Sequence, residues 1–172
     1  KLLGQNDVET APSEDANNAI SLAIVGRPNT GKSTLFNTLL GENRVITGPE
    51  PGVTHDSVHM DWNYNKRRVR LVDTAGLRRR PRVTDPIEKL SSEDSLQAIR
   101  FSSVGILLLD ATRPIARQDL TIAEHIASEG RAIVLCANKW DKVNRKKAVN
   151  DALAQQMDRA LPQLGTIPLV TC

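Results

Sequence analysis

The chain has 172 residues, of which 40% are hydrophobic and 25% charged, and its formal net charge is +3. This is the composition of a globular domain with its own core, and the positive charge is too small to establish a nucleic-acid partner. No apolar stretch approaches the length of a membrane span and no signal peptide is visible, so we expect no membrane partner.

The first elements can be placed from the pattern of apolar residues. Residues 1–18 are polar without sustained periodicity, and we expect a linker or disordered lead-in before a domain at 19–172. From residue 20 onwards, short apolar runs alternate with segments of helical periodicity. The runs are continuous, as in strands covered on both faces, and they predict strands at 20–26, 68–73, 103–111, 132–138 and 166–172.

Helices are predicted between these strands. Apolar residues recur at helical spacing in 32–41, 118–130 and 148–161. Gly41 and Gly130 are expected to end the first two helices, because glycine readily adopts the left-handed conformation of a C-terminal cap.

One segment has a different period. Residues 55–64 alternate apolar and polar side chains, so we predict an antiparallel hairpin with the strand at 68–73 through a turn at 65–67. The order of all the elements predicts an α/β fold. We expect a mostly parallel six-stranded sheet with one antiparallel strand and helices on both faces.

The first predicted strand runs into "GRPNTGKST" and then into a helix, which is the context that a phosphate loop requires. Its glycines let the backbone curl so that N–H groups converge on phosphate oxygens at a helix N-terminus. Its lysine supplies a point charge to the terminal phosphates, and its serine hydroxyl can join a magnesium shell. The residues expected to bind nucleotide here are Gly26, Arg27, Pro28, Asn29, Thr30, Gly31, Lys32, Ser33 and Thr34.

A second motif, "DTAGL", ends the strand predicted at 68–73. Beside the phosphate loop, its aspartate can hold magnesium directly or through water, and its glycine lets a backbone N–H approach the terminal phosphate. Segment 77–98 is expected to move when that phosphate leaves, as an order–disorder switch. The residues expected at this part of the nucleotide site are Asp73, Thr74, Ala75, Gly76 and Leu77.

The third motif, "NKWD", follows the strand predicted at 132–138. The Asp141 carboxylate can accept hydrogen bonds from N1–H and the 2-amino group of guanine, donors that adenine lacks, so we expect it to select the base. Asn138 can bridge neighbouring loops and the base, and the stem of Lys139 can lie along the guanine face. The predicted base-binding residues are Asn138, Lys139, Trp140 and Asp141.

Together, "GRPNTGKSTLFNTLLGENRV", "PGVTHDS", "LVDTAGLRRRPRV" and "NKWD" resemble the translation-factor class of P-loop GTPases, which have a Ras-like G domain. Within that class, residues 20–172 are similar to the second GTPase domain of the tandem-domain ribosome-assembly family Der, also called EngA. The resemblance implies slow hydrolysis of GTP to GDP with Mg²⁺, and binding to the large ribosomal subunit and its RNA. It also implies another GTPase domain before this one and a KH-like domain after it.

The resemblance implies roles for individual residues. Thr54 in "PGVT" would contact magnesium in the triphosphate state, together with Ser33 and Asp73. Leu77 stands where small signalling GTPases carry a glutamine that orients the attacking water, and leucine cannot hydrogen-bond a water. Several GTPases with an asparagine in the phosphate loop use K⁺ beside the phosphates, so Asn29 either ligates K⁺ or braces the loop. The residues expected to act in catalysis are Lys32, Asn29, Thr54 and Gly76.

The sequence departs from the family pattern at two places. His55 occupies a position where the family usually has arginine, which leaves its role open. The sequence stops at Cys172, just before the family's usual Ser-Ala motif, so we expect a domain truncated before its last motif and helix.

A run of arginines follows the second motif and has three interpretations. It could contact ribosomal RNA phosphates in one nucleotide state, dock the neighbouring KH-like domain, or keep a mobile loop soluble. The residues concerned are Arg78, Arg79, Arg80 and Arg82.

Cysteine and histidine patterns support neither a disulfide scaffold nor a zinc site. Cys136 and Cys172 lie far apart in sequence and Cys136 sits in an apolar run, so we expect reduced thiols in a cytoplasmic protein. His55 and His59 are four apart on a predicted strand, about 13 Å from each other, too far to share a metal ion.

These observations favour a GTP-hydrolysing switch in assembly of the large ribosomal subunit. A related ribosome-assembly or tRNA-modification GTPase is the nearest alternative. A module that holds nucleotide without turnover is a second alternative. An ATP-dependent kinase or ATPase is a third, against which Asp141 argues because its carboxylate would be unpaired beside adenine.

Overall fold

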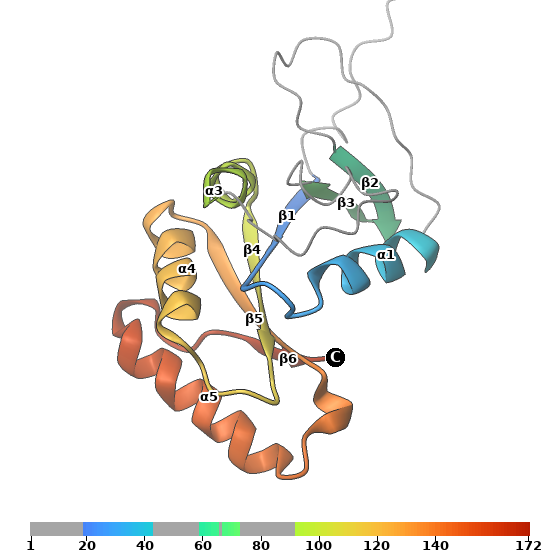
Figure 1. The fold of residues 1–172 in the computed structure, drawn as a ribbon. Helices are drawn as coiled ribbons and strands as arrows, with labels where there is room; N and C mark the ends of the chain where they lie inside the picture. Colours follow the sequence, from blue (N-terminus) through green and yellow to red (C-terminus); the bar gives the residue numbers. More distant parts are fainter. Residues whose placement is uncertain (1–18, 43–58, 66, 73–91) are drawn as a thin grey trace, which may run out of the picture.

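The computed structural model describes residues 19–42, 59–65, 67–72 and 92–172, and they form one six-stranded sheet with helices packed against it (Figure 1). The strand order is β2-β3-β1-β4-β5-β6. All neighbouring strands are parallel except β2 and β3, which are antiparallel. The strands are β1 Ile20–Val25, β2 His59–Tyr64, β3 Arg67–Val72, β4 Val104–Asp110, β5 Ala132–Asn138 and β6 Leu169–Thr171. The predicted α/β architecture is confirmed.

Helices cover both faces of the sheet, with α1 on one side and α4 and α5 on the other (Figure 1). The α-helices are α1 Lys32–Glu42, α3 Ser92–Arg100, α4 Arg117–Ser128 and α5 Lys146–Ala160. Two 3₁₀ turns, η2 Trp140–Lys142 and η3 Pro162–Leu164, flank α5. None of the described helices is long and apolar enough to cross a membrane.

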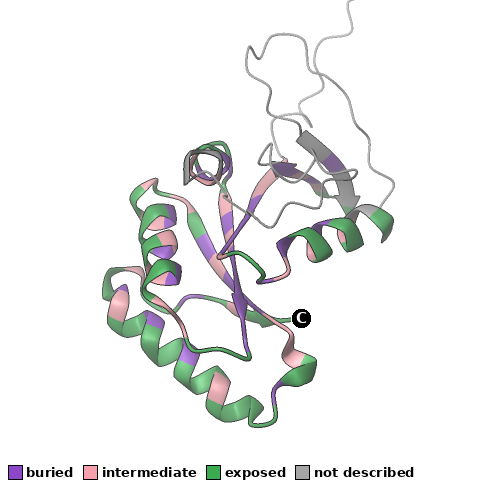
Figure 2. Cartoon of the chain, in the orientation of Figure 1, coloured by how far each residue is buried: buried purple, intermediate pink, exposed green. Residues whose placement is uncertain are grey.

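Alternation of side chains along β4 divides the core into two layers. Leu107 and Leu109 pack with Ile126 of α4 in one buried cluster, whereas Leu108 packs with Phe36 of α1 in another. Because successive side chains of a strand point to opposite faces, a continuous apolar run serves both layers. Figure 2 shows the resulting buried residues along the central strands and on the inner faces of α4 and α5.

The hairpin between β2 and β3 is tighter than predicted. Tyr64 pairs with Arg67, so Arg67 is the first residue of β3 and the predicted turn at 65–67 was one residue too long. Asn65 has φ +48°, a left-handed conformation that asparagine tolerates and that two-residue hairpin turns favour. The beginning of the predicted strand, residues 55–58, lies outside the described residues.

Only one of the two predicted glycine caps forms. Gly130 has φ +67° and donates its N–H to Ala127 O, while the Arg131 N–H reaches Ile126 O, so α4 ends in a Schellman motif as expected. Gly41 was predicted wrongly, because α1 continues through it to Glu42. Glycine costs a helix only about 1 kcal/mol, so it does not by itself end one.

Close packing of α4 on β4 requires a glycine in the sheet. A Cβ added at Gly105 would lie 2.8 Å from Cγ2 of Ile126, a side chain with 0% exposure. A Cβ added at Gly41 would have no neighbour within 4 Å. The two glycines therefore form a matched pair for testing the packing.

We expect Gly105→Ala to lower the free energy of unfolding by about 1–3 kcal/mol, because Ile126 must leave its packed position. The control Gly41→Ala should change it by less than about 1 kcal/mol, in the stabilising direction. Urea unfolding of both variants measures this difference. Equal stabilities for the two variants would contradict the packing of α4 on β4.

Candidate nucleotide-binding site

The three loops of the candidate site leave the carboxyl ends of β1, β4 and β5. In the strand order, β1 lies between β3 and β4, and the chain winds in opposite directions on its two sides. A crevice at such a switch point is the usual ligand site of an open α/β sheet. The loop after β1 is the predicted phosphate loop, and the loop after β5 carries the predicted base-reading motif.

Two glycines let the phosphate loop lie against the neighbouring strands. Gly26 has φ +151°, and a Cβ on it would collide with Leu108 O of β4. Gly31 has φ +100°, and a Cβ there would collide with Asn138 Nδ2 at the end of β5. Between them, Asn29 has φ +64°. The curl of this loop therefore depends on two positions that exclude any side chain.

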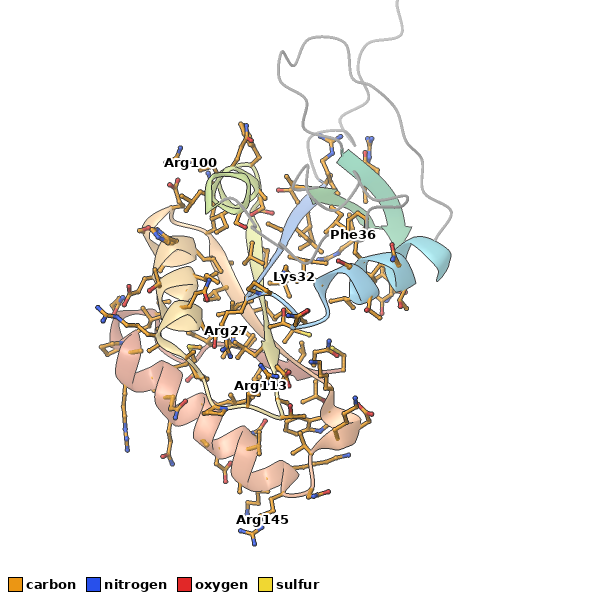
Figure 3. All side chains as sticks on the ribbon, viewed as in Figure 1. Arg27, Lys32, Phe36, Arg100, Arg113 and Arg145 are labelled. Atoms are coloured by element: carbon orange, nitrogen blue, oxygen red, sulfur yellow. The ribbon has the colours of Figure 1, made fainter. Side chains whose placement is uncertain are left out.

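The loop wraps around the Lys32 side chain, which is only 7% exposed. Lys32 Nζ donates to Arg27 O at 2.7 Å, and Thr30 Oγ1 donates to the same carbonyl at 2.9 Å. In Figure 3, Lys32 lies at the start of α1, where the loop meets the helix. A curled backbone and an ammonium group at a helix N-terminus are suited to bind phosphates.

Hydrogen bonds join the motif after β5 to the phosphate loop. Asn138 Nδ2 donates to Thr30 O at 2.8 Å, and Lys139 Nζ donates to Asn29 O at 2.9 Å. Lys139 has φ +62°, and its N–H donates to Asn138 Oδ1 at 2.7 Å. These contacts hold the two loops in one arrangement although they are more than 100 residues apart in sequence.

A carboxylate at the end of β4 completes this connection. Asp110 Oδ2 accepts from Lys139 Nζ at 2.7 Å, and Asp110 Oδ1 accepts from the N–H and hydroxyl of Thr112. Burial raises the pKa of Asp110, but the hydrogen bonds from Lys139 and Thr112 outweigh that effect and hold the pKa at about 2. Asp110 is therefore charged at neutral pH and anchors the Lys139 ammonium.

The structure brings together the predicted residues of the first and third motifs. Ser33, Thr34 and Asp141 are exposed beside the loops, and Asp141 lies in the turn η2. The remaining predicted residues lie outside the described part of the chain. They are Thr54, Asp73, Thr74, Ala75, Gly76 and Leu77, and the same holds for His55 and for Arg78, Arg79, Arg80 and Arg82.

Sequence reasoning missed two acidic residues of the site, Asp110 and Asp119. Asp119 has 0% exposure and its Oδ1 accepts from Arg27 Nε at 2.7 Å. Asp110 could have been found from its position at the end of an apolar strand. Asp119 gave no comparable signal, because an acidic residue in the first turn of a helix is usually read as solvent-exposed.

The predicted free thiols lie side by side at the end of the sheet. Cys136 Sγ of β5 and Cys172 Sγ are 3.3 Å apart, and neither forms a disulfide. Burial, and then the neighbouring Cys172, raise the pKa of the Cys136 thiol to about 12. Cys172 O accepts the Trp140 N–H at 3.0 Å, so the end of β6 also supports the base-reading motif.

Comparison with known proteins identifies the family. Residues 21–139 match the model of a family described as 50S ribosome-binding GTPases. The chain belongs to this family. The match covers the phosphate loop and the first residues of the motif after β5, so the prediction of a P-loop GTPase domain is confirmed.

Individual relatives are consistent with this result. The chain is 51% identical over 162 residues to GTPase Der of Parvibaculum lavamentivorans, covering 94% of this chain and 34% of that protein. It is 52% identical over 158 residues to GTPase Der of Brucella melitensis, with 92% and 33% covered. The resemblance to Der is confirmed, and the chain spans about a third of the length of these relatives. Its assignment to the second GTPase domain stays a prediction.

A solved structure supports the same fold. Era, in complex with MgGDPNP and nucleotides 1506–1542 of 16S ribosomal RNA, is 27% identical to this chain with a TM-score of 0.62. The similarity covers 90% of this chain and 51% of that chain.

The charge on Asp110 gives a pH-dependent prediction. Its pKa is about 2 in the folded chain against an ordinary 3.8, so its contribution to stability is complete above pH 3.8 and is lost as the pH falls towards 2. We expect Asp110→Asn to lower the free energy of unfolding by on the order of 2 kcal/mol near neutral pH. Urea unfolding should show this difference from the wild type shrinking below about pH 4. A difference that stays constant with pH would contradict the ion pair.

Proposed function

We propose that this domain binds guanine nucleotide and hydrolyses GTP as a molecular switch in assembly of the large ribosomal subunit. The main observation in its favour is that Asn138 and Lys139 donate hydrogen bonds directly to backbone carbonyls of the phosphate loop. Phosphate binding and base recognition require these two segments to face one ligand. Membership of a GTPase family supports the same function.

The phosphate loop supplies the first half of the site. Its backbone N–H groups and the Lys32 ammonium bind the β- and γ-phosphates of GTP. The exposed Ser33 hydroxyl, together with Thr54 and Asp73, would hold Mg²⁺, which prefers oxygen donors of this kind. When bound, Mg²⁺ neutralises phosphate charge. We expect the Gly76 N–H to contact the γ-phosphate, because the glycine of the motif "DTAGL" allows a close approach of the backbone.

The motif after β5 supplies the second half. The exposed Asp141 carboxylate accepts the two hydrogen bonds from guanine, and the anchored Lys139 stem forms a platform for its face. Asn138 connects this platform to the phosphate loop through Thr30 O. Base choice and phosphate position are therefore coupled through the same side chains.

Hydrolysis is slow because Leu77 offers no hydrogen bond to the attacking water. Asn29, at the left-handed turn of the phosphate loop, would hold K⁺ through its side-chain oxygen. When bound, K⁺ offsets the charge that builds between the β- and γ-phosphates. This part of the proposal rests on the asparagine and on the family resemblance.

The partners are proposed from the relatives. The family is described as 50S ribosome-binding, which supports the large subunit, whereas the 16S RNA in the similar Era structure belongs to the small subunit and supports only binding of ribosomal RNA. We infer that the intact protein works in the cytoplasm on the large subunit, with a preceding GTPase domain and a following KH-like domain. The arginines from Arg78 to Arg82 are candidates for contact with RNA phosphates or with the KH-like domain.

Lys32→Ala should abolish tight GDP binding, because the variant loses the charge enclosed by the phosphate loop. Lys147→Ala removes an exposed lysine of α5 and should leave the affinity unchanged. Calorimetric titration with GDP and Mg²⁺ measures both. Wild-type affinity in Lys32→Ala would refute the assignment of the phosphate site.

Asp141→Asn should change the base that is preferred. An amide cannot accept both guanine hydrogen bonds, but its NH₂ can donate to the 2-oxo group of xanthine. We expect GDP affinity to fall by at least about tenfold while xanthosine diphosphate gains affinity. Competition of the two nucleotides for each protein is the measurement. Unchanged preference for GDP would exclude Asp141 as the base-reading residue.

GTP turnover should be several-fold faster in KCl than in NaCl at equal ionic strength, and Asn29→Ala should remove the difference. Phosphate release under single-turnover conditions measures both rates. Equal rates above background in the two salts would reject K⁺ as a cofactor. Absence of turnover in both salts, with GDP still bound, would instead favour a module that only holds nucleotide.

A further inference from the structure

An ion pair between a buried aspartate and a partly buried arginine connects the phosphate loop to helix α4. Arg27 Nε and Asp119 Oδ1 are 2.7 Å apart, and the side chains are 20% and 0% exposed. In Figure 3, Arg27 lies between the loop and α4. The two residues are 92 positions apart in sequence, so the pair is a tertiary contact between separate elements.

Asp119 is held on both of its oxygens. While Oδ1 accepts from Arg27, Oδ2 accepts from the backbone N–H of Ala116 at 2.9 Å, so the carboxylate also caps the start of α4. A carboxylate with no exposed surface is costly unless its charge is compensated. Removing the Arg27 guanidinium therefore leaves a buried charge without its cation.

The backbone of Arg27 is held in place as well as its side chain. Its carbonyl oxygen accepts from Lys32 Nζ and from Thr30 Oγ1, and the preceding Gly26 is pressed against Leu108 O. Through its side chain and its carbonyl, Arg27 links Asp119 to the ammonium that faces the phosphate site. A shift of the Arg27 backbone would displace the acceptor that orients Lys32.

We propose that Asp119 is a positioning residue for nucleotide binding, which acts through Arg27 to hold the phosphate loop in the conformation that presents Lys32. Asp119 touches no nucleotide in this role. The inference rests on the proposed function, because it assumes that the loop binds phosphates. In this role, helix α4 helps to fix the position of the phosphate loop through Asp119.

The test compares Asp119→Asn, Arg27→Gln and the double variant with the wild type. Asp119→Asn keeps the size of the side chain and an oxygen for the Ala116 N–H, but loses the charge that holds Arg27. We expect at least about tenfold weaker GDP binding in each single variant, and no further loss in the double variant because the residues act as one unit.

Asp61→Asn is the matched control. Asp61 of β2 pairs with Arg70 at 2.9 Å, with side chains 11% and 21% exposed, so this variant also breaks a partly buried arginine–carboxylate pair. The pair lies on the β2–β3 hairpin rather than against the phosphate loop. We expect Asp61→Asn to lower stability but to leave GDP affinity within about twofold of the wild type.

A second readout separates positioning from general stability. In nucleotide-free protein, backbone amide exchange of residues 26–34 should accelerate in Asp119→Asn and remain unchanged in Asp61→Asn. If Asp119→Asn does not fold, Arg27→Lys, which keeps a cation beside Asp119, should fold and bind GDP with intermediate affinity.

The outcomes distinguish the two proposals. Folded Asp119→Asn or Arg27→Gln with wild-type GDP affinity and wild-type loop exchange would overturn the positioning role while leaving the proposed function intact. A wild-type protein that binds no GDP would reject the proposed function and this role together. Equal losses of affinity in Asp61→Asn and Asp119→Asn would also overturn the positioning role, because they would reflect stability alone.

Discussion

The close approach of the phosphate loop to the carboxyl ends of β4 and β5 is the contact on which the site depends. Gly26 lies against Leu108 O and Gly31 against the Asn138 amide, with no room for a Cβ at either position. Because the loop is this close, Asn138 can reach Thr30 O and Lys139 can reach Asn29 O. A bulkier loop would separate the segment that faces phosphates from the segment that faces the base.

Two buried acidic residues hold the phosphate loop and the loop after β5 in place. Asp110 pairs with Lys139 and Asp119 pairs with Arg27, so one carboxylate holds the loop after β5 and another holds the phosphate loop. A buried ion pair adds little net stability compared with apolar packing, but breaking one partner is expensive. We infer that these pairs specify loop geometry more than they stabilise the fold, which is carried by the two apolar layers around β4.

Most of the fold, the phosphate loop and the base-reading motif could be predicted from sequence, because each is marked by residues that are close together in the chain. Continuous apolar runs marked the parallel strands, and the glycine pattern and "NKWD" marked the loops. The predictions that were wrong or missing concerned long-range contacts, or small differences in backbone conformational energy. Gly41 stays inside α1 because a glycine only weakly disfavours helix, and Arg67 joins β3 because a two-residue turn suffices. The role of Asp119 was not predicted, because its partner Arg27 is 92 residues away in the sequence.

The most direct test of the central claim is a calorimetric comparison of GDP and ADP binding in the presence of Mg²⁺. We expect GDP to bind tightly and ADP to bind at least about a thousandfold more weakly, because adenine leaves the Asp141 carboxylate unpaired. Both nucleotides carry the same phosphates, so the difference reports the base alone. Equal affinities for GDP and ADP would contradict the claim that the two linked loops form one guanine nucleotide site.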